Sequence, residues 1–449
     1  MKKLLNEKLI SLAERLSSPL YLVGGCVRDF LIDKKISSDV DICSALTVGE
    51  VVERAKECDL VIVGEYKRTG TAILFDGKNK YEFTSFRKDI YSEGGGHTPD
   101  LTIRTTSILE DSLRRDFKCN AVYFDIKKGE FVDLLGGIED IKNKVISTVK
   151  DAKEVFSHDG LRLMRLARLS AELNFNVDKK TLIGARENSD KIEDISKERI
   201  LEELEKILSS DEKHSFSDKR GHYNGLKLLD EIGVLERILP ELTLGKGMEQ
   251  RKDFHNYDVF EHSLRSVLYA PKEIRFAMLL HDVGKPYAFL KNGKFHSHEV
   301  YGEEIAKKIT SRLKLSKKKS EEIAFIVRNH MLDLKGDMRE SKIRKFIVNN
   351  LPLIDELLMA KQADYSACKD DLSLALGVKK WREIIEKMKK EKVPFSKGEL
   401  KINGKDLIKL GYKGEEIGKR LDKILELAVI GEVKNEREEL LRILKTHKG

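Results

Sequence analysis

The stretch YLVGGCVRDFLIDKKISSDVDIC, residues 21–43, holds the pattern that decides the fold of the N-terminal part of the chain. An apolar run before Gly24 predicts a strand, and the residues after Gly25 predict a helix, so the two glycines mark a tight turn. Backbone amides of such a turn and of the helix N-terminus point toward a bound phosphate. The stretch therefore predicts a phosphate-binding turn, with Arg28 adding a positive charge.

The same stretch ends in two acidic residues, Asp39 and Asp41, on a short strand. Side chains alternate along a strand, so we expect Val40 and Ile42 to face a core and both aspartates to face the other way. Neighbouring carboxylates repel each other unless a cation lies between them, and Mg²⁺ prefers carboxylate oxygen. We predict that the pair binds Mg²⁺ for an in-line nucleotidyl transfer; the alternative is a solvated strand end.

The composition is that of a soluble globular protein of several domains, with 449 residues, 40% hydrophobic and 36% charged. Apolar runs fall short of the roughly 20 residues of a membrane span, and the N-terminus does not resemble a signal peptide, so we expect a cytoplasmic protein. Five scattered cysteines without a CxxC pair argue against a disulfide framework and a structural zinc site. The net charge of +8 allows a polyanionic partner without requiring one.

Strand patterns alternate with short helices at the start of the chain, and helical periodicity follows nearly throughout. We therefore predict an α+β fold, in which an N-terminal head with a small mixed sheet is followed by an all-helical body. Turn-like segments suggest where its parts meet. The expected parts are a head at residues 1–148, a helical neck at 149–245, a third domain at 246–370 and a helical tail at 371–449.

A second candidate site lies in HDGLRLMRLAR, residues 158–168. Asp159, Arg162, Arg165 and Arg168 recur every three residues, which predicts that they share one broad helix face. A carboxylate accepts from the exocyclic amine of cytosine or adenine and repels the carbonyl that uracil or guanine presents there, while a guanidinium donates to the same base edge. Asp159 and Arg162 are thus predicted to select C and A without a template; the alternative is an i,i+3 surface salt bridge.

Four motifs occur in a fixed order: YLVGGCVRDFLI with SDVDI, SLRRDFKCNAVYFD, DLLGGIEDIKNKVI and DGLRLMRLARLSAEL. In order and spacing they resemble the class II CCA-adding tRNA nucleotidyltransferase and bacterial poly(A) polymerase superfamily, over roughly residues 20–245. The resemblance implies that Asp39 and Asp41 are the catalytic metal ligands. It implies that the nucleotide-binding residues are Gly25, Arg28, Arg115, Asp116, Asn120, Asp159, Arg162, Arg165 and Arg168.

The resemblance also suggests individual roles. Arg115 is expected to meet the triphosphate or sugar, and Asp116 and Asn120 to organise the ribose side of the pocket. Glu82 is a candidate third acid or an exposed strand glutamate. The family usually has Glu before the aspartate of the DxxR motif, where this chain has His158. The glycine-rich segment between the strand and RRD resembles the family's loop for switching from C to A, which favours an A-adding or CCA-adding enzyme.

Histidines and aspartates recur between residues 250 and 370, where adjacent His281 and Asp282 lie in an apolar segment. Burying them unpaired is costly, and a shared metal ion removes that cost. The spacing resembles the HD metal-dependent phosphohydrolase domain, and mixed nitrogen and oxygen ligands suit Mn²⁺, Fe²⁺, Ni²⁺ or Zn²⁺. The resemblance implies a domain that either hydrolyses a phosphoester or serves as a scaffold. The resemblance implies the ligands His262, His281, Asp282 and Asp364, with His298 and His330 for a second ion.

The tail resembles the C-terminal region of many bacterial CCA-adding enzymes. Its basic residues predict a surface for tRNA phosphates, and the alternative is a solvated helical tail. These residues are Lys405, Lys409, Lys413, Lys419 and Arg420.

Together the motifs predict an enzyme that adds C, C and A to tRNA 3′ ends from CTP and ATP. The alternatives are a poly(A) polymerase or A-adding enzyme on the same scaffold, an HD domain that is an inactive RNA-binding scaffold, and a scaffold or RNA-binding protein with a degenerate site. The intact acidic pair and the DxxR motif speak against the last of these.

Overall fold

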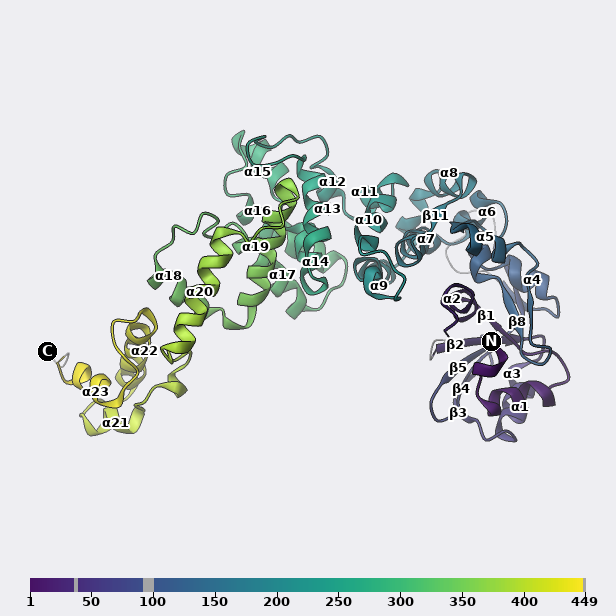
Figure 1. Cartoon of the computed structure of the whole chain (residues 1–449), viewed down its shortest axis with the longest axis horizontal. Coiled ribbons are helices and arrows are strands. Elements are labelled where there is room, and N and C mark those ends of the chain that lie inside the picture. Colours follow the sequence, from purple (N-terminus) through teal and green to yellow (C-terminus); the bar gives the residue numbers. More distant parts are fainter. Residues whose placement is uncertain (36–38, 92–100, 447–449) are drawn as a thin grey trace. The chain divides into compact units, whose positions relative to one another are not determined.

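The computed structural model describes residues 1–35, 39–91 and 101–446, and for Asp39 the backbone alone. The chain forms two compact units, Met1–Thr243 and Leu244–Gly449. In the described residues every strand belongs to the first unit, and the second unit is built from helices (Figure 1). None of the described helices has both the length and the apolar character needed to cross a membrane. The predicted α+β head with an all-helical body is confirmed.

A seven-stranded mixed sheet lies at the centre of the head, in the order β3-β4-β5-β2-β1-β8-β9. β2 and β5 run parallel and the other neighbours antiparallel, which sets Asp41 beside Glu82. The strands are β1 (Tyr21–Val23), β2 (Asp39–Ser44), β3 (Val61–Tyr66), β4 (Thr71–Phe75), β5 (Lys80–Ser85), β8 (Tyr123–Asp125) and β9 (Glu130–Val132). Two smaller pairs are β6 (Arg87–Ile90) with β7 (Leu101–Arg104) and β10 (Val145–Ile146) with β11 (Asn176–Val177).

The turn between β1 and α2 (Gly25–Asp33) brings the start of this helix against β2. Gly24 has φ 79° and ψ −145°, a conformation that glycine adopts at little cost because it has no Cβ. In β2, Val40 and Ile42 are buried while Asp41 between them is exposed, as the alternation predicted. The strand, turn and helix expected from residues 21–43 are therefore present.

The other helices of the first unit cover the sheet and form the neck. α3 packs on β3, β4 and β5, and α7 packs on α9 and α10. They are α1 (Glu7–Arg15), α3 (Val48–Lys56), α4 (Ile108–Leu113), α5 (Gly137–Asn143), α6 (Ala152–His158), α7 (Leu161–Leu173), α8 (Lys179–Glu187), α9 (Lys197–Leu208), α10 (Gly221–Glu231), α11 (Leu235–Ile238) and α12 (Pro240–Thr243).

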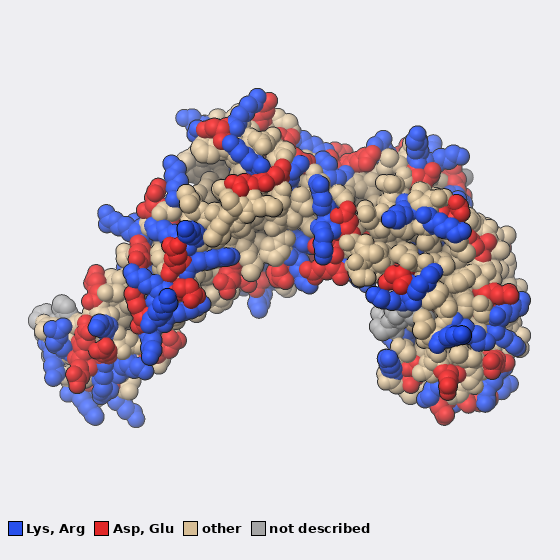
Figure 2. All heavy atoms as spheres, viewed as in Figure 1, with Lys and Arg blue, Asp and Glu red and all other residues tan. Residues whose placement is uncertain are grey.

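The second unit packs α13 against α14 and α19, and α16 against α17. Its tail has a hydrophobic core of its own, formed by residues 400–444. Over the tail, Figure 2 shows basic and acidic side chains side by side, in agreement with ion pairs such as Lys419–Glu415. The helices are α13 (Val259–Tyr269), α14 (Arg275–Leu280), α15 (Lys285–Asn292), α16 (His298–Arg312), α17 (Lys317–Asn329), α18 (Glu340–Asn349), α19 (Ile354–Lys369), α20 (Leu376–Lys390), α21 (Gly404–Lys409), α22 (Glu415–Ile430) and α23 (Arg437–Thr446).

Candidate active site and metal centre

A cleft of about 1010 Å³ opens beside β2 in the first unit. Asp41 lines it, while the side chain of Asp39 and the glycine-rich segment 92–100 lie outside the described residues. Glu82 is exposed on the neighbouring strand and does not belong to the cleft lining. The cleft also brings together all nine residues predicted to bind the nucleotide: Gly25, Arg28, Arg115, Asp116, Asn120, Asp159, Arg162, Arg165 and Arg168.

The glycine turn lies directly against the predicted metal ligand. A Cβ placed on Gly24 would lie 2.9 Å from Oδ2 of Asp41. Any residue other than glycine at this position would therefore displace the Asp41 carboxylate. Arg28 is buried and donates to Asp29 and to Oδ1 of Asn120, each at 2.8 Å. Burial opposes its charge, but Asp29 outweighs that effect and raises the pKa of Arg28. Arg28 is thus a fixed positive charge at the cleft.

A buried acid that the sequence analysis missed anchors the next two arginines. Asp111 accepts hydrogen bonds from Arg114 at 2.8 Å, Arg115 at 3.0 Å and the hydroxyl of Tyr123 at 2.7 Å. Burial raises the pKa of Asp111, but the two guanidinium groups outweigh it and hold the pKa below its ordinary value. The only sequence signal was an acid three and four residues before an arginine pair. The anchored pair forms one positive wall of the cleft.

The prediction that Asp159, Arg162, Arg165 and Arg168 share one helix face is wrong for Asp159, which lies outside the helix. α6 ends at His158, Asp159 has extended backbone (φ −153°, ψ 105°), and α7 begins at Leu161. Oδ1 of Asp159 accepts from the backbone N–H of Leu161 at 3.0 Å, because a short acidic side chain before a helix competes for its free amides. The alternative of an i,i+3 salt bridge is not observed, since neither Asp159 nor Arg162 forms an ion pair in the described part of the chain; Arg162 donates to backbone carbonyls instead.

The arginines of α7 are held by different partners. Arg162 is 8% exposed and donates to two backbone carbonyls, those of Val155 at 3.1 Å and Arg114 at 2.9 Å. Nε of Arg165 donates to Asp116 at 2.7 Å. Burial raises the pKa of Asp116, but Arg165 outweighs it and holds the pKa far below its ordinary value. Backbone and carboxylate partners therefore fix where each guanidinium lies.

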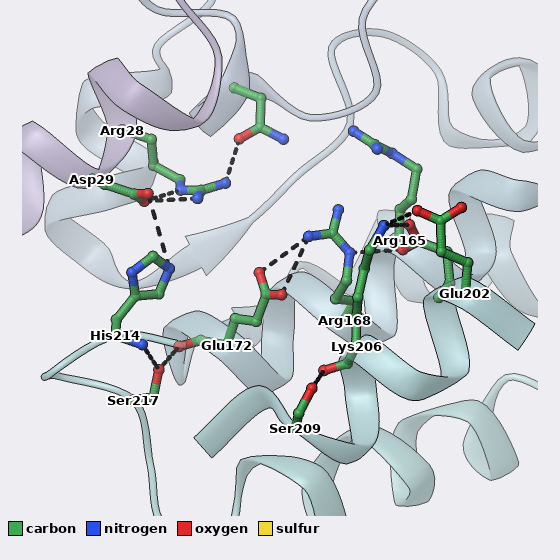
Figure 3. A network of polar contacts seen from close by, with 12 residues as sticks. Arg28, Asp29, Arg165, Arg168, Glu172, Glu202, Lys206, Ser209, His214 and Ser217 are labelled. Atoms are coloured by element: carbon green, nitrogen blue, oxygen red, sulfur yellow. Dashed lines mark hydrogen bonds and ion pairs between the residues drawn. The ribbon is translucent and has the colours of Figure 1, made fainter. Parts of the chain in front are cut away.

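A polar network at one end of the cleft ties α7 to its neighbours (Figure 3). Arg168 donates to the buried carboxylates of Glu203 at 2.7 Å and Glu172 at 3.2 Å. On the other side of the view, Nε2 of His214 lies 3.9 Å from Asp29, the partner of Arg28. Arg168 thus has two acidic partners within the protein, besides lining the cleft.

In the second unit, the residues predicted as HD ligands converge on one buried centre. Nε2 of His262 lies 2.9 Å from Oδ1 of Asp364 and 3.2 Å from Nε2 of His281. Nε2 of His281 also lies 3.2 Å from Oδ2 of Asp282. Burial lowers the pKa of His281, but the carboxylates of Asp282 and Asp364 outweigh it and raise the pKa to about 10. The centre therefore favours positive charge.

The carboxylate of Asp282 joins this group to a second one. Its Oδ1 lies 3.2 Å from Nε2 of His298 and 3.7 Å from Nε2 of His330. The ligand atoms of His262, His281 and Asp282 lie within 4.8 Å of one another, and so do those of Asp282, His298 and His330. These six residues could hold divalent metal ions, and the carboxylate of Asp282 lies within reach of both groups of histidines.

The backbone fixes the tautomers of three of these histidines. Nδ1 of His281, His298 and His330 lies 2.7–2.9 Å from the carbonyl oxygen three residues earlier in each case. Because Nδ1 donates its hydrogen there, Nε2 is the ring atom that faces the centre, and it offers a lone pair when the imidazole is neutral, as it must be in a metal ligand. Two such lone pairs meet at 3.2 Å between His298 and His330, which is unfavourable unless they share a proton or a metal ion. The donor chemistry fits a divalent metal.

Two further residues lie beside this centre. Nζ of Lys285, from the sequence HDVGK, is 2.6 Å from Asp282 and donates to Gln250 at 2.6 Å. Burial lowers the pKa of His255 to about 4, and its ring packs edge-on against His262. His255 lies outside the His–Asp spacing and was not predicted. Both line a pocket of about 360 Å³ that adjoins the second group of ligands.

Three family models match the chain. Residues 20–147 match the poly A polymerase head domain, residues 174–244 the probable RNA and SrmB-binding site of polymerase A, and residues 259–367 the HD domain. The head and HD domains both imply dependence on divalent metal ions.

Similar proteins cover most of the chain. An A-adding tRNA nucleotidyltransferase of Deinococcus radiodurans is 31% identical over 74% of this chain and 77% of its own length. A CCA-adding enzyme of Lactococcus lactis is 30% identical over 95% and 92%, and a CC-adding tRNA nucleotidyltransferase of Thermus thermophilus is 29% identical over 93% and 91%. The crystal structure of the Bacillus stearothermophilus CCA-adding enzyme in complex with CTP matches with a TM-score of 0.70, 25% identity and coverage of 98% and 96%. The resemblance seen in the motifs is confirmed, and the chain belongs to the tRNA nucleotidyltransferase family with a poly(A) polymerase head domain.

Proposed function

We propose that the protein adds C, C and A to the 3′ ends of tRNA, from CTP and ATP and without a nucleic-acid template. The observation that carries this proposal is the cleft, which brings Asp41, the glycine turn, the anchored arginines and Asp159 together. Its positive wall suits a triphosphate, and the Asp159 carboxylate suits the exocyclic amines of cytosine and adenine. Relatives named CCA-adding enzymes, aligned over nearly the whole chain, add support.

In this proposal Asp39 and Asp41 hold Mg²⁺ at the cleft. The ion supplies charge neutralisation for the triphosphate and lowers the pKa of the attacking hydroxyl. The chain's own residues do the rest: Arg28 and Arg115 contact the triphosphate and sugar, and Asp159 with Arg162 recognises the base. Because Asp29 already holds Arg28 and Asp111 already holds Arg115, these arginines need no rearrangement when the charge develops.

A-adding activity is the main alternative, since relatives of similar identity carry the names A-adding and CC-adding. Three tRNA transcripts, ending before CCA, after C and after CC, distinguish these functions when incubated with Mg²⁺ and each labelled NTP. We expect C on the first two transcripts, A on the third, and no further addition after CCA. A without C on every transcript would identify an A-adding enzyme, and a long A tract would identify a poly(A) polymerase. Asp41→Ala protein serves as the inactive control.

For the second unit we propose a metal-dependent phosphohydrolase that acts on a phosphomonoester or a 2′,3′-cyclic phosphate. The convergence of four histidines and two aspartates on one buried centre favours this function, because these residues could hold a divalent metal ion, which would supply activation of a water molecule. The mixed nitrogen and oxygen donors suit Mn²⁺, Ni²⁺, Fe²⁺ or Zn²⁺. Activity on p-nitrophenyl phosphate with each ion is the direct test, and inactivity with all of them, on this ester and on cyclic nucleotides, would leave the domain as a scaffold.

We further propose that the tail binds the body of the tRNA. Residues 371–449 hold 20 Lys and Arg against 14 Asp and Glu, so most of the chain's excess positive charge lies there. Acidic neighbours pair with Lys419 and Arg420, which leaves Lys405, Lys409 and Lys413 as the stronger candidates for phosphate contacts. Replacing these three lysines by Gln is expected to raise KM for tRNA and to reduce its salt dependence, without changing KM for CTP.

A further inference from the structure

An aromatic pair lies next to the residues proposed to recognise the base. Tyr91 follows strand β6 and lines the cleft, and its ring stacks on His158 with centroids 4.3 Å apart and planes 12° apart. His158 directly precedes Asp159 in the chain. The pair therefore joins the end of β6 to the segment that carries Asp159.

Tyr91 lines the same cleft as the predicted base-recognition residues Asp159 and Arg162. Burial raises the pKa of Tyr91, with further effects of Arg162, which lowers it, and of Asp89 and Asp159, which raise it. His158 covers one face of the ring. The contact that Tyr91 makes with the cleft therefore comes from its other face or its edge, beside Asp159 and Arg162.

We propose that Tyr91 is the stacking platform for the base of the incoming nucleotide, and that His158 positions the ring from behind. The proposal rests on the proposed base recognition by Asp159. The two contacts are complementary, since hydrogen bonds with a carboxylate form in the plane of the base and stacking acts on its face. Every base has a π-face, so stacking strengthens binding of C and A alike while the edge contacts select them.

Nucleotide binding without tRNA tests this directly. Equilibrium dialysis of ATP and CTP with Mg²⁺ measures Kd for the wild type, Tyr91→Leu, Tyr91→Ala and Tyr91→Phe. Losing one stacking contact is expected to raise Kd about 5- to 100-fold in the Leu and Ala variants, more for the larger adenine, and Tyr91→Phe should stay close to the wild type. Tyr66→Ala, on exposed strand β3, is the matched control and should bind both nucleotides normally.

Two results would overturn the proposal. If Tyr91→Leu, which keeps an apolar side chain in place and so guards against misfolding, binds ATP like the wild type, Tyr91 does not stack on the nucleotide. If the variants raise KM for tRNA and leave the Kd of ATP and CTP unchanged, the platform serves the primer end. His158→Phe should retain tight binding and His158→Ala should weaken it. Because binding is measured without turnover, failure to add C and A would contradict the proposed function and leave this result intact.

Discussion

At the scale of the residue, Asp159 shows how position changes the role of a side chain. Outside the helix, its Oδ1 is bonded to the amide of Leu161, and the carboxylate also lines the cleft. A carboxylate held in this way presents an acceptor, whereas an amide in the same place also offers a donor. The preference for C and A over U and G therefore depends on the chemical type of residue 159.

We predict that Asp159→Asn lowers discrimination between CTP and UTP. Asn also caps a helix N-terminus, so the local structure is retained, but its NH₂ group can donate to the carbonyl of uracil. The ratio of kcat/KM for CTP to that for UTP should fall about 10- to 100-fold on a tRNA ending before CCA. Asp253→Asn, at an exposed ion pair in the second unit, should leave the ratio unchanged. An unaltered ratio in the Asp159 variant would contradict its role in base selection.

Asp116 predicts a defined pH dependence of stability. Its pKa when folded lies below the unfolded value of about 3.9, so its pairing with Arg165 stabilises the fold above about pH 4 and this contribution is lost as the pH falls through the folded pKa. Asp116→Asn should therefore lower the free energy of unfolding by about 3 kcal/mol at pH 7, and the difference should begin to narrow below about pH 4.

Hydrogen exchange of the α7 amides is the suitable measurement for this variant, because the single tryptophan, Trp381, reports on the second unit alone. Asp253→Asn removes an ion pair that is exposed to solvent and should show no such difference. If the difference in stability between Asp116→Asn and the wild type were independent of pH, the charge of the Asp116 carboxylate would not contribute to the free energy of unfolding.

At the scale of the element, the strand–turn–helix of residues 21–33 matters because of one backbone conformation. The turn needs a positive φ at Gly24 and also needs the space that a Cβ would occupy against Asp41. Helix α2 then begins at the cleft and carries Arg28 into it. The position of the Asp41 carboxylate therefore depends on the backbone conformation of the phosphate-binding turn.

We predict that Gly24→Ala lowers the rate of nucleotide addition by at least about 10-fold. The strained backbone costs on the order of 1–3 kcal/mol, and the methyl group displaces the Asp41 carboxylate. Single-turnover incorporation of C measures the effect. Gly49→Ala is the control, since a Cβ there meets no atom within 4 Å and the residue lies in helix α3, where Ala is favoured. Equal rates in the two variants would show that the turn tolerates a side chain.

At the scale of the whole molecule, the two units hold two chemically different centres, one with arginines and carboxylate oxygens and one with imidazoles. We predict that His281→Ala abolishes metal-stimulated phosphatase activity and leaves nucleotide addition within about 2-fold, because the two centres belong to separate compact units and share no residues. Parallel assays of C incorporation and of p-nitrophenyl phosphate hydrolysis measure both. If phosphatase activity survives the substitution, His281 is not required for the proposed hydrolysis.

The sequence by itself determined the head with its mixed sheet, the helical body, the glycine turn, the orientation of Val40, Asp41 and Ile42, and the family. Turns and strand alternation depend on residues a few positions apart, so local patterns predict them. The HD ligands were also recognisable, because the order and spacing of these histidines and aspartates resemble those of the HD domain.

Only the tertiary structure decided how the arginines are anchored, where α7 begins, that Asp282 bridges two groups of ligands, and that Tyr91 stacks on His158. The physical reason is distance along the chain. Arg165 and its partner Asp116 are 49 residues apart, and Tyr91 and His158 lie on separate segments, so no local pattern contains either contact. Such pairs form when the folded backbone brings the side chains together.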